Sequence, residues 1–147
     1  MAVKPNSKPD PYQVPVDTLA VGEQVRGVLG SFPSVELALL FGSVATGRQR
    51  PDSDLDIAIA AKHRLTADEK MDIIASLAEA TGRPIDLVDL RQAGEPLLGQ
   101  VLTHGWRLMG SDIAYAPWIT RHVLNQADFV PYRDRVLAER RAAWIGQ

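Results

Sequence analysis

Three aspartates in the middle of the chain carry side chains suited to metal-dependent chemistry. Asp54 and Asp56 stand two positions apart at the start of the apolar run LDIAIA, and Asp86 is the second residue of the run IDLVDL. Because side chains at i and i+2 of a strand point to one face, Asp54 and Asp56 should project together. Neighbouring carboxylates repel each other unless a cation neutralises them. Magnesium fits this pair, since it binds one or two carboxylates together with waters and phosphate oxygens.

A glycine-serine pair lies upstream of these aspartates. Gly42 and Ser43 follow the apolar run VELALLF, and ten residues separate Ser43 from Asp54. Glycine lets the backbone approach a ligand closely, and the amides and hydroxyl around the serine can donate to phosphate oxygens. Arg48 and Arg50 lie on the connection and could neutralise phosphate charge. We therefore expect this turn to bind phosphate beside the two aspartates.

A third carboxylate is needed if the bound metal is also to activate an attacking hydroxyl. Asp86 fits this place on a neighbouring strand, whereas Asp89, three positions later, faces the other side, so only one of the two can join the site. The predicted reaction is an in-line displacement at the α-phosphorus of a nucleoside triphosphate. One metal ion would lower the pKa of the acceptor hydroxyl and a second would stabilise the leaving pyrophosphate. Asp86 would bind the first ion or take the proton.

Composition limits the classes of protein to which the chain can belong. Its 147 residues, 46% hydrophobic and 23% charged, suit one globular domain, and the lack of cysteine excludes disulfides and thiolate metal sites. The formal net charge of −2 gives no general attraction to a polyanion, so direct nucleic-acid binding is not expected. No apolar run reaches the ~18 residues of a membrane span and no secretory signal pattern is found, so we expect a cytoplasmic protein without a membrane partner.

The elements that must position these residues alternate between helices and strands. Residues 1–16 hold four prolines and predict a flexible tail, and a first helix is expected from Asp17, as N-cap, to a stop at Gly30. Three apolar runs predict strands: Val35–Phe41, Leu55–Ala60 and Ile85–Leu90. A loop rich in glycine, serine, arginine and proline is expected from Gly42 to Ser53.

Further helices are predicted between and after these strands. Thr66 and Glu69 form a capping box for a helix that ends at Gly82. Its apolar face is expected to consist of Met71, Ile74, Ala75 and Ala78. Another helix is expected over Leu97–Leu102, followed by a short return through Trp106–Met109. Tyr115–Gln147 is predicted to be helical, with an interruption at Pro117 and a new start near Pro131. This order predicts an α/β protein of the α+β type, with a mixed β-sheet flanked by helices.

The motif Gly42-Ser43, ten residues, then Asp54-Leu55-Asp56 resembles the signature of the DNA polymerase β-like nucleotidyltransferase superfamily. The short chain is most similar to minimal nucleotidyltransferases (MNT, or MntA-type proteins), antitoxins that act beside HEPN-domain toxin ribonucleases. The resemblance implies a nucleotidyltransferase fold, two Mg²⁺ ions and ATP as the nucleotide donor. In that family the antitoxin transfers AMP from ATP to a tyrosine of its toxin and so blocks the ribonuclease.

The resemblance also assigns roles to individual residues. Gly42 and Ser43 would contact the nucleotide phosphates, Asp54 and Asp56 would bind metal, and Asp86, rather than Asp89, would be the third carboxylate. Many relatives carry arginine at the position of Thr46, and Arg48 can supply that contact to the nucleotide. The implied organisation is a nucleotidyltransferase domain over 17–110 and a C-terminal helical extension over 111–147.

Three functions remain open at this stage. The first is transfer of AMP to a HEPN toxin, which would form a hetero-oligomer with this chain. The second is a non-catalytic antitoxin that neutralises its partner by binding. The third is nucleotide transfer to a small hydroxylated molecule, as in the aminoglycoside nucleotidyltransferases.

Other residues predict no second site. The three histidines lack the spacing of metal ligands, and the three tryptophans more often close a core or a subunit contact: His63, His104, His122, Trp106, Trp118 and Trp144. The basic residues near the C-terminus alternate with acidic ones, which is typical of a solvated helix, and a partner-binding helix is the alternative.

Overall fold

Four strands form one mixed sheet, in the order β3-β2-β1-β4, in a computed structural model that describes residues 16–45 and 53–127. The strands are β1 (Val35–Phe41), β2 (Leu55–Ala61), β3 (Ile85–Asp89) and β4 (Trp106–Met109). β1 pairs antiparallel with both β2 and β4, whereas β3 lies parallel to β2. The predicted mixed sheet is therefore confirmed.

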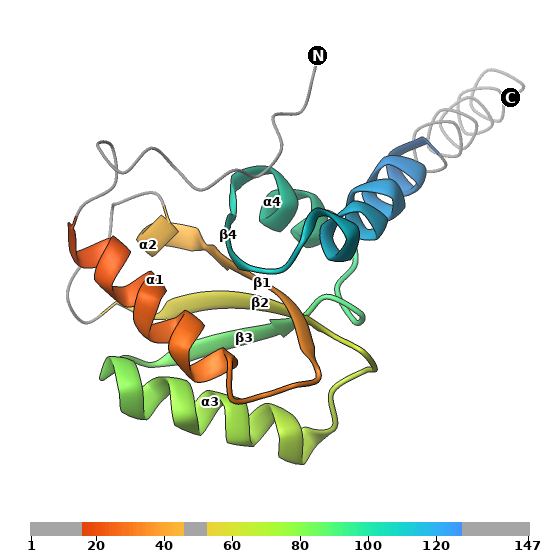
Figure 1. Cartoon of the computed structure of the whole chain (residues 1–147). Coiled ribbons are helices and arrows are strands. Elements are labelled where there is room, and N and C mark those ends of the chain that lie inside the picture. The colour runs from red at the N-terminus through yellow and green to blue at the C-terminus, as the bar shows by residue number, and fades with distance from the viewer. Residues whose placement is uncertain (1–15, 46–52, 128–147) are drawn as a thin grey trace, which may run out of the picture.

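Helices cover both faces of this sheet (Figure 1). They are α1 (Val16–Leu29), α2 (Gly42–Ala45), α3 (Ala67–Thr81), α4 (Leu97–His104) and a helix over 112–127. α1 and α3 lie on one face, and α4 and helix 112–127 lie on the other. The predicted flanking of the sheet by helices is thus confirmed for the described residues.

The two layers explain the nearly continuous apolar runs of the central strands. Along β2, Ile57 and Ile59 pack with Leu77 of α3, whereas Ala58 and Ala60 belong to the cluster on the opposite face. A strand that is buried on both faces needs apolar residues at successive positions rather than at alternate ones. Polar residues at the start of such a strand therefore stand out in the sequence.

α1 differs slightly from its prediction. It begins at Val16, so Asp17 lies in its first turn and is not its N-cap. Gly22 weakens the helix in isolation, but packing explains why a glycine stands there. A Cβ atom at this position would lie 3.0 Å from the Trp106 ring. The glycine allows α1 to approach β4 closely.

The apolar face of α3 is shifted from its prediction, although the predicted ends of the helix are correct. Of the predicted face residues, Ile74 is partly buried against the core. The Thr66–Glu69 capping box forms and Gly82 is the C-cap, but the buried residues are Ile73 and Leu77. Met71 is 67% exposed. Ile73 and Leu77 stand at the i, i+4 spacing of one helical face, and this face meets the sheet.

Two expectations about the C-terminal third are also wrong. Trp106–Met109 is an edge strand rather than a simple return, and helix 112–127 continues through Pro117. Proline removes one helical hydrogen bond, but Tyr115, Trp118 and Ile119 pack against the core on both sides of it. This packing outweighs the cost of the proline.

Some expectations lie outside the described residues. They concern most of the tail 1–16, the loop residues 46–52 with Thr46, Arg48 and Arg50, and residues 128–147 with Trp144. Among the described residues, none of the helices has the length and apolar character needed to cross a membrane.

Candidate active site

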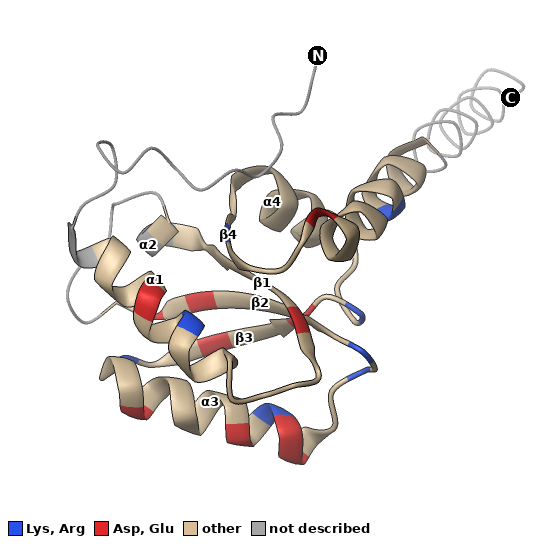
Figure 2. Cartoon of the chain, in the orientation of Figure 1, with Lys and Arg blue, Asp and Glu red and all other residues tan. Residues whose placement is uncertain are grey.

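The three predicted carboxylates lie at one end of the sheet. Asp56 is the second residue of β2 and stands in register with Asp86 of the parallel strand β3. In-register residues of adjacent strands are about 4.8 Å apart and point to the same face. Asp54 immediately precedes β2 and is exposed, while Leu55 between the two aspartates is fully buried. Figure 2 shows acidic positions side by side at the starts of β2 and β3.

Asp56 and Asp86 interact directly. Burial raises the pKa of Asp56 to about 6, and the charge of Asp86, a hydrogen bond with the Asp86 carboxyl and the charge of Asp54 add to the effect. A hydrogen bond between two carboxyl groups requires that one of them holds a proton. Two neighbouring carboxyl groups, one of which has a raised pKa, are a natural site for a cation, which can take the place of a proton.

Gly42 lies directly against this pair. Its φ is 74°, in the left-handed region, and a Cβ atom built on it would collide with the carboxylate of Asp56. Phe41, the preceding residue, is the register partner of Asp56. The end of β1 therefore brings a glycine backbone into contact with the acidic pair, and only glycine fits there.

The connection after β1 differs from its prediction. Gly42–Ala45 forms α2, one turn of helix, whereas an irregular loop was expected from Gly42 onward. Ser43 occupies the second position of α2, next to Gly42 in the chain. Arg48 lies in the part of the connection that is outside the described residues.

These carboxylates suit a magnesium ion that keeps part of its water shell better than a metal ion enclosed entirely by protein side chains. Within residues 16–45 and 53–127, no three histidine, aspartate or glutamate side chains form a group that could hold a metal by themselves. Magnesium commonly keeps several waters and binds one or two carboxylates together with substrate phosphates. The Asp56–Asp86 pair, with the exposed Asp54 beside it, provides ligands of this kind.

Asp89 has a different task from Asp86. It is only 3% exposed, and its carboxylate accepts hydrogen bonds from the backbone N–H groups of Leu65 and Arg91, both at 2.9 Å. These bonds fix the loop that enters α3 and the turn that follows β3. Asp89 therefore lies apart from the carboxylate cluster, on the opposite face of β3 from Asp86.

Two of the histidines, His63 and His122, and the described tryptophans have structural partners. His63 lies 3.0 Å from Glu69, His122 lies 2.7 Å from Glu95, and Trp106 is buried in the core. Trp118 is different, because the guanidinium groups of Arg91 and Arg121 lie over its ring. No local sequence pattern signals this group, since Arg91 is far along the chain from Trp118 and Arg121.

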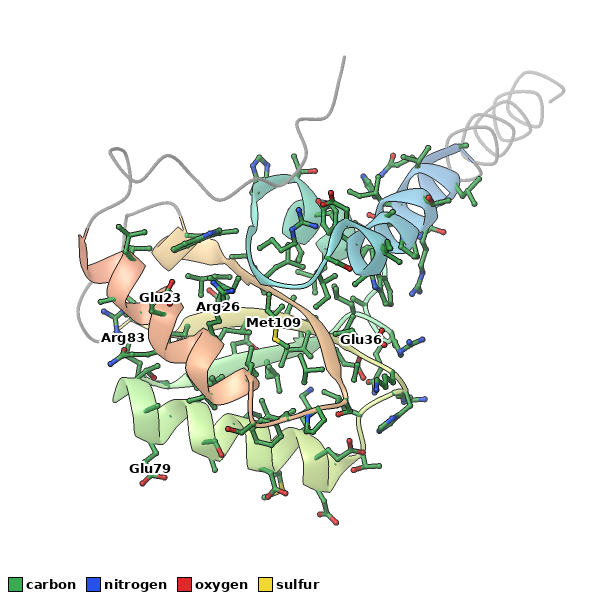
Figure 3. The ribbon with its side chains drawn as sticks, in the orientation of Figure 1. Glu23, Arg26, Glu36, Glu79, Arg83 and Met109 are labelled. Carbon is green, nitrogen blue, oxygen red and sulfur yellow. The ribbon has the colours of Figure 1, made fainter. Side chains whose placement is uncertain are left out.

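A cavity of about 670 Å³ lies next to Trp118. None of the predicted site residues lines it, and Arg91 and Glu36 place it at the other end of the strands from Asp56. Figure 3 shows this separation, with Arg83 near the start of β3 on one side and Glu36 on the other. The candidate active site is therefore defined by the converging carboxylates and not by this cavity.

Comparisons with known proteins agree with the fold and with the motif. The family model described as Polymerase beta, Nucleotidyltransferase matches residues 23–114. The chain is 40% identical over 81 residues to protein adenylyltransferase MntA of Shewanella oneidensis, an alignment that covers 55% of this chain and 58% of that relative. The chain thus spans less than two thirds of that relative's length.

Solved structures of toxin-antitoxin complexes are also similar to the chain. A toxin-antitoxin crystal structure with AMP-PNP contains a chain that matches with a TM-score of 0.64 and 31% identity, over 79% of this chain and 98% of that one. A structure of the tri-AMPylated Shewanella oneidensis HEPN toxin with its MNT antitoxin matches with a TM-score of 0.61 and 28% identity, over 82% and 98% of the two chains.

Proposed function

Since the chain belongs to the polymerase beta nucleotidyltransferase family, we propose that it transfers AMP from ATP to a hydroxyl group, most specifically a tyrosine of a HEPN toxin, and so acts as an antitoxin. The observation that carries this proposal is the contact of Gly42 with Asp56, beside Asp86 in the adjacent strand. A triphosphate can approach the backbone of the glycine closely, and the carboxylates beside it can bind the magnesium counter-ion of the triphosphate.

The residues of the site would divide the work as follows. Asp54, Asp56 and Asp86 would hold two magnesium ions, and this requires that Asp56, whose pKa is raised, be deprotonated. Bound magnesium would lower the pKa of the acceptor hydroxyl and neutralise charge on the leaving pyrophosphate. Gly42 and Ser43 would contact the phosphates, with Arg48 as a further cationic contact.

The bond changes of the proposed reaction are simple. The acceptor oxygen forms a bond to the α-phosphorus of ATP as the bond from this phosphorus to the bridging oxygen breaks, and pyrophosphate leaves. The proton of the acceptor hydroxyl passes to the carboxylate of Asp86. The domain that carries this chemistry would extend over 17–110, and 111–147 would be a helical extension.

The relatives support the choice of acceptor. One relative is named a protein adenylyltransferase, and one similar antitoxin was crystallised with an AMPylated HEPN toxin. We therefore propose that this chain also modifies a protein, with ATP as the nucleotide donor and magnesium as the cofactor. A hetero-oligomer with the HEPN toxin follows from the same proposal.

A transfer assay tests the proposal. The purified chain is mixed with ATP labelled at the α-phosphate, Mg²⁺ and the product of the neighbouring gene, and we expect label on that protein. Asp54→Asn and Asp56→Asn should each abolish transfer, while Asp72→Asn, an exposed carboxylate of α3, should retain it. Undiminished transfer by the first two variants would refute the site.

The same assay separates the alternative functions. If the Asp56→Asn variant still silences the toxin and no AMP adduct forms with wild type, the chain neutralises its partner by binding alone. If a small hydroxylated molecule such as an aminoglycoside is modified without the partner, the chain is a small-molecule transferase.

A further inference from the structure

Exposed aliphatic side chains are concentrated on one helix. Among the described residues, four large hydrophobic side chains are exposed: Met71 (67%), Ile113 (86%), Val123 (55%) and Leu124 (58%). Three of the four lie on helix 112–127. Ile113 and Leu124 are eleven positions apart, which is about three helical turns, so they share a face. The two residues are about 16 Å apart along the helix, with the exposed Pro117 between them on the same face. Apolar residues aligned in this way favour an interaction surface, whereas a single exposed one such as Met71 is ordinary.

The same helix forms one wall of the cavity of about 670 Å³. The other walls include Glu36 at the start of β1 and Arg91 after β3, and Trp118 and Arg121 line it from the helix. We call this cavity the arginine–tryptophan pocket. Its apolar rim includes Ile113, so the pocket and the exposed face of the helix are continuous.

The arginines of the pocket are held in place. Arg91 donates from Nε to the carbonyl of Ala61 at 2.9 Å and from Nη2 to the carbonyl of Lys62 at 3.3 Å. Its Cζ lies 5.9 Å from the centre of the Trp118 ring, and that of Arg121 lies 5.5 Å from it. Because the Arg91 guanidinium is already bonded to two backbone carbonyls, it would lose little conformational entropy on binding a partner. Tryptophan and arginine are also the residues that most often dominate protein interfaces.

Charge distinguishes this end of the molecule from the active-site end. Lys62 and Arg64 lie on the loop after β2, whose backbone Arg91 contacts, and Arg121 faces the same pocket. Figure 2 shows these basic positions at the end of the sheet opposite the acidic starts of β2 and β3. Glu36 is the acidic residue among those that line the pocket, and Asp112 at the start of the helix pairs with Arg107 at 2.9 Å. The surface therefore complements a partner that presents carboxylates.

We propose that the exposed face of helix 112–127, with the arginine–tryptophan pocket, docks the protein that accepts AMP; this inference rests on the proposed function. The docked segment carries aliphatic side chains against Ile113 and Leu124 and a carboxylate against Arg91 and Arg121. A nucleic acid would match the arginines but would leave the aliphatic face uncovered. A symmetric contact between two copies would bring their basic groups against each other.

The docking surface is separate from the chemistry. Ala61, whose carbonyl Arg91 contacts, stands five positions after Asp56 in β2, so the two sites are about 16 Å apart along the strand. An acceptor protein of ordinary domain size spans this distance easily. Contacts at the pocket hold the acceptor without touching the reacting atoms, so their loss should raise KM for the acceptor and leave kcat nearly unchanged.

Binding without ATP tests the docking surface. The affinity of the neighbouring gene's product for the full chain is measured by calorimetry for wild type, Ile113→Glu with Leu124→Glu, Arg121→Glu, Met71→Glu and Asp56→Asn. We expect each change in helix 112–127 to weaken binding at least tenfold, and Met71→Glu and Asp56→Asn to bind as wild type does. Circular dichroism and thermal melts establish whether the helix variants are folded. The milder variant Ile113→Ala replaces any helix variant that does not fold.

The outcomes separate this inference from the proposed function. Wild-type affinity in the helix variants would overturn the docking surface even where AMP transfer is intact. Weakened binding without any AMP transfer by wild type would support the surface and refute the proposed chemistry. If Ile113→Glu dissociated a homodimer, the surface would belong to a contact between two copies of the chain. If Arg121→Glu abolished binding of a labelled single-stranded RNA and left partner binding unchanged, the surface would belong to a nucleic acid. Either result would overturn the inference.

Discussion

The backbone of Gly42 lies so close to the side chain of Asp56 that no side chain fits at position 42. The glycine adopts a φ of 74°, and an added methyl group would collide with the Asp56 carboxylate. Two strands meet here, because Phe41 and Asp56 are register partners of β1 and β2. The spacing of the glycine and the aspartates in the sequence thus corresponds to a contact in space, and the first prediction addresses it.

Gly42→Ala should reduce transfer on the order of 100-fold, since a displacement of about 1 Å at a reacting group has this effect. The left-handed backbone adds a stability cost of about 1–2 kcal/mol. Gly27→Ala is the matched control, because a Cβ atom at Gly27 in α1 would meet nothing within 4 Å and alanine favours a helix. Initial rates and thermal melts measure both effects. Full activity in Gly42→Ala would show that the contact has no role in catalysis.

Asp56→Asn should stabilise the metal-free protein near neutral pH. An acid whose pKa is raised on folding, here from 3.8 to about 6, contributes stability that is complete below pH 3.8 and is lost as the pH rises through 6. The full shift corresponds to about 3 kcal/mol, and because Asp56 is only partly buried we expect about 1 kcal/mol. Asparagine does not titrate and escapes this loss.

Melts between pH 4 and pH 7.5, in the presence of a chelator, measure this difference. The melting temperature of wild type should fall relative to that of Asp56→Asn across this range, and Asp72→Asn gives the baseline. Added Mg²⁺ should stabilise wild type more than Asp56→Asn, because the aspartate is a proposed ligand. A constant difference between the two proteins at all pH values would contradict the carboxyl-pair interpretation.

Asp86→Asn and Asp89→Asn should have opposite effects. Asp86→Asn should abolish transfer without loss of stability, because it relieves repulsion with Asp56. Asp89→Asn should lower stability by about 1–3 kcal/mol, since one of the amides of Leu65 and Arg91 loses its acceptor, and should retain transfer at low temperature. Denaturant unfolding and transfer rates of the two variants measure this. Equal effects of the two variants on both quantities would mean that neither carboxylate has the separate role described.

The sequence predicts those parts of the fold that depend on local patterns. β1, β2 and β3 and the capping box of α3 are predicted correctly because apolar runs and the Thr66–Glu69 spacing are local signals. The convergence of Asp56 and Asp86 follows from strands that lie side by side, a relationship that the motif resemblance supplied.

Features that depend on tertiary packing were missed. β4 is only four residues long and forms through its pairing with β1, and helix 112–127 passes through Pro117 because its flanking residues pack on the core. The arginine–tryptophan pocket joins Arg91 and Trp118, which are distant in sequence. No local pattern encodes such a contact, so these features required the structure.

Gly99→Ala should loosen helix 112–127 from the rest of the fold. A Cβ atom on Gly99 would lie 2.5 Å from Cε1 of His122 and 3.1 Å from Oε2 of Glu95, and these two side chains form the 2.7 Å contact between helix 112–127 and the start of α4. Overpacking of this kind costs about 1–3 kcal/mol.

Hydrogen exchange measures the consequence locally. Amides of helix 112–127 should exchange faster in Gly99→Ala, with little change in α3 on the far face of the sheet. Gly94→Ala is the control, because a Cβ atom there would meet nothing within 4 Å. Since the displaced helix carries Ile113 and Leu124, Gly99→Ala should also weaken binding of the acceptor protein while the carboxylate pair stays intact. Unchanged exchange in the helix would show that His122 and Glu95 move aside without cost, and that their contact does not position the docking surface.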